Sequence, residues 1–144
     1  MHNGRIETTR DADGHAVVLG CFDLSSDEAR AAAHVMSVVR RERYGLAELG
    51  TDDVLAMREL TALADELAHV GEGAAISLVL PPGRLTALRD ALDAFVSSRD
   101  EAEWLREEDR EPIAVARALL WPLGDLCTDA LRAALYADDA ATAG

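Results

Sequence analysis

The segment from Ile113 to Ala134 is apolar on most of its circumference, and it constrains the fold more than any other feature of the chain. Apolar residues recur at alternating spacings of three and four, as on one face of an α-helix: Ile113, Ala116, Leu120, Leu123, Cys127, Ala130 and Ala134. A second set occupies much of the remaining circumference: Leu119, Trp121, Leu126, Leu131 and Leu135. Such a helix is expected either at the centre of the fold or covered on its second side by another copy of the chain.

Two prolines are expected to shape this segment. Pro112 suits the first turn of the helix, where a missing N–H costs nothing. Pro122 lies inside the helix and removes one backbone hydrogen bond, so we expect a bend or a break there, helped by Gly124. Residues 137–144 have nothing to bury and are expected to form a flexible tail.

Three further helices are predicted upstream. Ser25 and Glu28 form a capping box that begins a helix ending at Gly45. A second helix runs from Thr51 to about residue 70, and a third begins after Pro82. The third presents an apolar face: Leu85, Leu88, Leu92, Phe95 and Val96.

The third helix is expected to break or bend near residues 97–98, because Trp104 lies about half a rotation away from Phe95 around a helix. Ser98 and Glu101 would then cap a new start. The charged segment 100–111 is predicted to be a short surface helix, pinned by Trp104 and Leu105.

Two stretches have the pattern of strands rather than helices. Residues 1–24 predict a β-hairpin, with turn residues from Asp11 to Gly14. Ile76–Leu80 is a short apolar run stopped by two prolines, too apolar for an edge exposed to solvent, so we expect it beside the hairpin or across a dimer axis. At 144 residues the chain predicts a single domain, 1–144, of predominantly helical α+β fold: four to five helices with a small antiparallel sheet from the hairpin and a strand near 75–80.

Composition excludes several classes of function. A net charge of −13 argues against direct binding of nucleic acid, which needs a basic surface. All 14 basic residues are Arg, so no lysine is present for a P-loop ATPase. No apolar run is long enough to cross a membrane, and the polar N-terminus does not look like a secretory signal. With Cys21 and Cys127 far apart and outside any CxxC spacing, the default expectation is a cytoplasmic protein with two ordinary thiols, although a redox bridge between them stays open.

Candidate site residues are few. Gly83 and Arg84 stand at a helix N-terminus, where free N–H groups can receive an anion. Glu66 and His69 have the spacing of a carboxylate–histidine metal motif, but half of the ligand set is missing. Asp125 and Cys127 lie beside Pro122 in the last helix, and with Trp121 they could line a cavity. No catalytic motif is found, and no cofactor is predicted.

The helices carry more apolar surface than one small domain easily covers, and this favours association with another chain. A symmetric homodimer would bury the last helix through interface residues that are large and apolar: Trp104, Leu119, Trp121, Leu123 and Leu126. The preferred hypothesis is therefore a non-catalytic interaction or regulatory protein that acts as a homodimer or on another protein. The alternative is a small-molecule binding protein or enzyme with a pocket near Pro81–Arg84 and Trp121–Cys127. A third is an acidic mimic of nucleic acid, whose carboxylates from Glu101 to Glu111 would form a spaced row.

Overall fold

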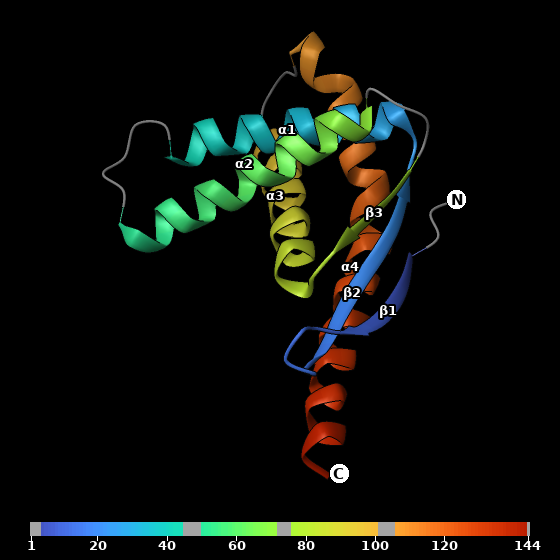
Figure 1. Ribbon diagram of the computed structural model, residues 1–144. Helices are drawn as coiled ribbons and strands as arrows, with labels where there is room; N and C mark the ends of the chain where they lie inside the picture. Colours follow the sequence, from blue (N-terminus) through green and yellow to red (C-terminus); the bar gives the residue numbers. More distant parts are fainter. Residues whose placement is uncertain (1–3, 45–49, 72–75, 101–105, 144) are drawn as a thin grey trace.

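The computed structural model describes residues 4–44, 50–71, 76–100 and 106–143 (Figure 1). Over these ranges the chain forms four helices and a three-stranded antiparallel sheet, which confirms the predominantly helical α+β fold. The elements follow in the order β1 (Gly4–Arg10), β2 (Ala16–Leu24), α1 (Ser26–Tyr44), α2 (Thr51–Gly71), β3 (Ile76–Leu80), α3 (Pro82–Asp100) and α4 (Glu107–Ala143).

The predicted hairpin is confirmed. β1 pairs with β2 from Gly4 opposite Phe22 to Arg10 opposite Ala16. Asp11 closes the turn, because its Oδ1 accepts hydrogen bonds from the N–H groups of Asp13 at 3.0 Å and His15 at 2.9 Å. Gly14 has a φ of +82°, a conformation that favours glycine, so the turn depends on this residue.

β3 lies beside the hairpin, as expected, but at the edge of the sheet rather than at its centre. β3 pairs antiparallel with β2, from Gly20 opposite Leu80 to Leu24 opposite Ile76, and so lies at an edge of the sheet, with β2 in the centre. The strand alternates: Leu78 and Leu80 are buried, whereas Ser77 and Val79 are exposed. An apolar run of this kind can therefore form an edge strand, because only alternate side chains need a covered face.

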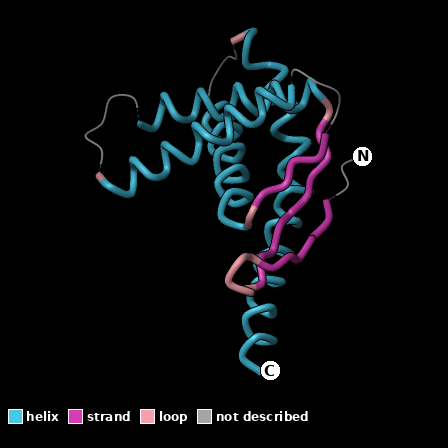
Figure 2. The backbone as a smooth tube through the Cα atoms, viewed as in Figure 1, coloured by secondary structure: helices cyan, strands magenta, loops and turns pink. Residues whose placement is uncertain are grey.

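The helices pack on one another and against the sheet (Figures 1 and 2). α4 lies along β2 and β1, α3 packs against α4, and α1 packs against α2, α3 and α4. The apolar face predicted for α3 is buried throughout, at Leu85, Leu88, Leu92, Phe95 and Val96.

The ends of the helices agree with the predicted caps in part. The Ser25–Glu28 capping box is formed, with Glu28 N–H 3.2 Å from Ser25 Oγ and Ser25 N–H 2.9 Å from Glu28 Oε1. The predicted break in α3 is wrong: the helix continues to Asp100, and the Ser98 hydroxyl donates to the Phe95 carbonyl at 2.9 Å. Trp104, Leu105 and Glu101 lie outside the described residues.

α4 also differs from expectation at both ends and in the middle. It begins at Glu107 rather than Pro112, so no separate surface helix ends at residue 111. Pro122 does not break the helix, which continues for 37 residues to Ala143. Flexibility of residues 137–144 stays a prediction, although the helix extends past Tyr136.

Candidate functional site

At the predicted anion site, the backbone and side chain of Arg84 are engaged by other groups of the chain. The N–H groups of Arg84 and Leu85 donate to the Pro81 carbonyl at 3.1 and 3.0 Å. The Arg84 side chain pairs with acids of α2, with Nε 2.9 Å from Glu59 Oε1 and Nη1 3.8 Å from Glu66 Oε2. An anion at this N-terminus would have to displace these partners.

The other predicted ligands are not brought together. Glu66 faces Arg84, and His69 is exposed at the end of α2. Asp125 is exposed, whereas Cys127 is buried and desolvation raises the pKa of its thiol. Within the described ranges no three His, Cys, Asp or Glu side chains are placed to hold a metal ion.

Most of the predicted interface is core of the single chain. Leu119, Leu123 and Leu126 are buried against the sheet and the other helices, which explains their apolar spacing without a partner. These three residues were expected at a dimer interface, but the single chain already buries them. Trp104 lies outside the described residues. Trp121, by contrast, is 82% exposed and is the one member of the set that the structure places on the surface.

Trp121 belongs to an apolar face of α4 that nothing in the described chain covers. Three other large apolar side chains of α4 are exposed: Leu131, Leu135 and Tyr136. The last turns of α4, drawn in red in Figure 1, extend beyond the β1–β2 turn. We call Trp121, Leu131, Leu135 and Tyr136 the outer α4 face.

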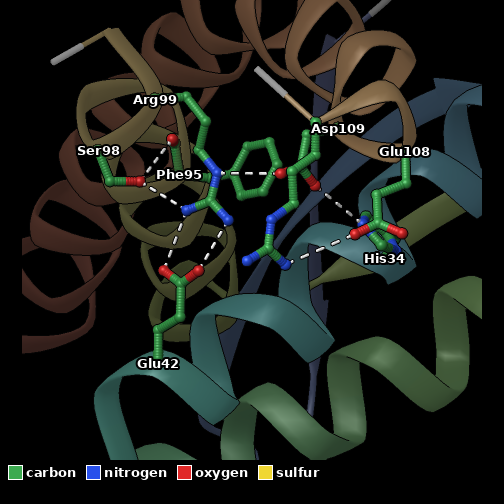
Figure 3. A network of polar contacts seen from close by, with 8 residues as sticks. His34, Glu42, Phe95, Ser98, Arg99, Glu108 and Asp109 are labelled. Carbon is green, nitrogen blue, oxygen red and sulfur yellow. Dashed lines mark hydrogen bonds and ion pairs between the residues drawn. The ribbon is translucent and has the colours of Figure 1, made fainter. Parts of the chain in front are cut away.

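A second feature, which the sequence did not predict, is a polar cluster where α1, α3 and α4 meet (Figure 3). Asp109 is the one buried charged residue in the described ranges, at 6% exposure. Its Oδ2 lies 3.6 Å from Arg99 Nε, and its Oδ1 lies 3.5 Å from His34 Nε2.

Arg99 connects this cluster to α1 and to the core. Its Nη1 and Nη2 donate to the two carboxylate oxygens of Glu42 at 3.0 and 2.7 Å. Nη1 also donates to Ser98 Oγ at 2.8 Å, and the guanidinium carbon stands 4.3 Å from the centre of the Phe95 ring. The hydrogen bonds from Arg99 lower the pKa of Glu42, and those to Glu42 raise the pKa of Arg99. Both groups are therefore held in their charged forms.

Two hollows open beside the cluster, away from the predicted pocket. One has a volume of about 460 Å³ and is lined by His34, Val38, Arg41, Glu42, Arg99, Arg106, Glu108 and Asp109. The other has a volume of about 500 Å³ and is lined by Asp27, Arg30, Ala31, His34, Glu107, Glu108, Glu111 and Pro112.

The acidic residues at the start of α4 contribute to these hollows rather than to a continuous acidic row. Glu107, Glu108 and Glu111 are exposed. Asp109 lies between them but is buried and contacts Arg99 and His34. Glu101 and Glu103 lie outside the described residues. The row that an acidic mimic of nucleic acid needs is thus interrupted within the described part of the segment.

In the described part of the chain, no helix is both long enough and apolar enough to cross a membrane. Comparison of the chain with protein-family models, with curated proteins and with solved structures gives no match.

Proposed function

We propose that the protein is a non-catalytic interaction module that acts as a homodimer through the outer α4 face. The observation that carries the proposal is the exposure of Trp121 at 82%, together with Leu135 at 69% and Tyr136 at 65%, on one helix. Large apolar side chains gathered on a surface mark interaction sites more often than single exposed ones do.

The spacing of this face fits an antiparallel pairing of two α4 helices. Trp121 and Leu135 are 14 residues apart, close to four helical turns, so they point in directions that differ by about 40°. Thr128 is midway between them. With a two-fold axis beside Thr128, Trp121 of each copy lies opposite Leu135 of the other, and the two contacts are equivalent.

The charges on the same face are complementary in this arrangement. Asp125 and Arg132 are exposed and form no ion pair with the described residues of their own chain. The two-fold axis brings Asp125 of one copy next to Arg132 of the other, twice. Opposite charges that meet at the rim of an apolar contact add register and specificity more than affinity.

The experiment is sedimentation equilibrium of the full chain over a wide concentration range. We expect a monomer–dimer equilibrium that Leu135→Glu shifts toward monomer by at least tenfold in dissociation constant, about 1.4 kcal/mol. Leu55→Glu is the matched control, because Leu55 is similarly exposed, at 57%, but lies on α2. It should leave the equilibrium unchanged.

Charge reversal tests the register. Asp125→Arg and Arg132→Asp should each weaken the dimer, and the double variant should recover it, since the pairs are restored with exchanged signs. A chain that stays monomeric at every concentration would overturn the proposal, as would a dimer that Leu135→Glu and Leu55→Glu affect equally.

A further inference from the structure

The two hollows beside the polar cluster adjoin each other along α1. They share His34 and Glu108, and their α1 residues follow one another along a single face of the helix. Asp27, Arg30 and Ala31 line one side of His34, and Val38, Arg41 and Glu42 line the other. We call this feature the α1 groove.

One end of the α1 groove offers positive charge. Arg41, Arg99 and Arg106 line it. Arg99 is bound by Glu42 and Asp109, so these three charged groups are paired within the chain. Arg41 is exposed and forms no ion pair with the described residues, and Arg106 Nη1 lies 3.7 Å from Glu108 Oε1. The guanidinium group that no described acid engages is therefore that of Arg41, because Arg106 is paired with Glu108.

The other end offers negative charge. Asp27, Glu107, Glu108 and Glu111 line it together with Arg30. Arg30 pairs with Asp27, and Arg110 Nε lies 3.5 Å from Glu107 Oε2. Glu111 is exposed and forms no ion pair with the described residues. The groove thus has an unpaired arginine toward one end and an unpaired glutamate toward the other.

The wall between the two ends is fixed before any ligand arrives. Asp109 is buried between His34 and Arg99, and Arg99 is stacked on Phe95 and bound to Glu42. Figure 3 shows these side chains converging from α1, α3 and α4. A site with pre-positioned side chains loses less entropy on binding than one that must order them.

We infer that the α1 groove binds a short extended peptide, with its free C-terminal carboxylate at Arg41 and its basic N-terminal end at Glu111. The charges at the two ends of such a peptide match those of the groove. Ala31 and Arg41 are ten residues apart on α1, about 15 Å, which an extended peptide of about five residues spans.

The test uses the full chain and the pentapeptide Lys-Ala-Ala-Ala-Ala with both termini free, with binding measured by isothermal titration calorimetry. We expect saturable binding in a 1:1 ratio per chain. Amidation of the C-terminus should weaken it at least tenfold, and so should the acetylated peptide with alanine in place of lysine, since each change removes one end's charge.

Substitutions of exposed residues assign the two ends. Arg41→Ala should weaken binding of the free peptide but leave the weak binding of the amidated peptide unchanged. Glu111→Gln should likewise weaken binding of the free peptide but leave the weak binding of the acetylated, lysine-free peptide unchanged. Arg58→Ala is the matched control, because Arg58 is an exposed arginine of α2 outside the groove. Absence of saturable binding would overturn the inference. Inorganic phosphate that binds as tightly as the peptide would also overturn it, because it would show an anion site with no need for the acidic end.

Discussion

Arg99 on α3 binds both carboxylate oxygens of Glu42 on α1, with Nη2 2.7 Å from Oε1 and Nη1 3.0 Å from Oε2. The two residues are 57 positions apart in the chain. This two-point contact connects the end of α1 to the end of α3. Asp109, at the start of α4, pairs with Arg99 of α3 and with His34 of α1, so it connects α4 to both helices.

The first prediction concerns the pH dependence of stability. Because Arg99 lowers the pKa of Glu42 below its ordinary value of 4.5, the folded state binds that proton less readily than the unfolded state. The contribution of the pair is then fully present above pH 4.5 and is lost as the pH falls through the lowered pKa. Glu42→Gln should cost about 0.2–1 kcal/mol at pH 7, since the glutamate is half exposed.

Thermal unfolding of the wild type and of Glu42→Gln at several pH values checks this. The difference in Tm should shrink steadily below pH 4.5. Glu7→Gln, at an exposed pair with Arg5 at 3.5 Å, serves as the control. A gap that stays constant down to pH 2 would contradict the linkage.

The second prediction concerns the buried carboxylate. Arg99→Ala removes the cation beside Asp109 and the stacking on Phe95, so it should destabilise the fold by about 3–5 kcal/mol in urea unfolding. Arg99→Lys should recover little, because an ammonium cannot bond both Glu42 oxygens and Asp109 together. If the loss comes from the uncompensated charge, adding Asp109→Asn to Arg99→Ala should cost less than Asp109→Asn alone.

The third prediction concerns a close contact between β2 and α3. A methyl group at Gly20 would lie 2.3 Å from Leu85 Cδ1, and Leu85 is fully buried. Gly20→Ala should therefore destabilise the protein by about 1–3 kcal/mol. In a Leu85→Ala background the same change should lower the free energy of unfolding much less. Gly83→Ala, which meets nothing within 4 Å, is the control and should be close to neutral.

The fourth prediction concerns the two thiols. Cys21 and Cys127 are free and buried, and desolvation raises the pKa of both. Both the small thiolate fraction and the lack of access slow their reaction with thiol reagents. We expect modification of the native protein at pH 8 to proceed at the rate at which the fold opens and exposes the thiols. In denaturant, modification should be immediate. Fast labelling of the native protein would show that the structure opens locally around one of the thiols. The two Cys→Ser variants would identify which thiol it is.

Local features of the fold could be predicted from the sequence, and long-range ones could not. The Ser25–Glu28 cap and the apolar face of α3 depend on residues within a few turns of each other. Ser98 has the pattern of a cap, but its hydroxyl bonds the Phe95 carbonyl within a continuing helix, because Arg99 and Phe95 pack together there.

The polar cluster was missed for the same reason. Nothing in the segment around Asp109 distinguishes it from its exposed neighbours, and its partner His34 lies 75 positions away. Leu119, Leu123 and Leu126 are buried because the sheet and the other helices cover that side of α4. The periodicity of the sequence alone does not predict which sides of α4 are covered. Trp121 shares the apolar pattern of these three leucines but is exposed, and its place in an interface stays a prediction.

The unbroken length of α4 sets how this protein can change over evolutionary time. Each residue advances the helix by about 100°, so inserting or deleting one residue between Ala116 and Trp121 would rotate everything after it by that amount. Ile113 and Ala116 would keep their places while Leu123 and Cys127 turned out of the core. A substitution on the exposed side of α4 leaves this register unchanged, but a change in the number of residues between its two prolines does not.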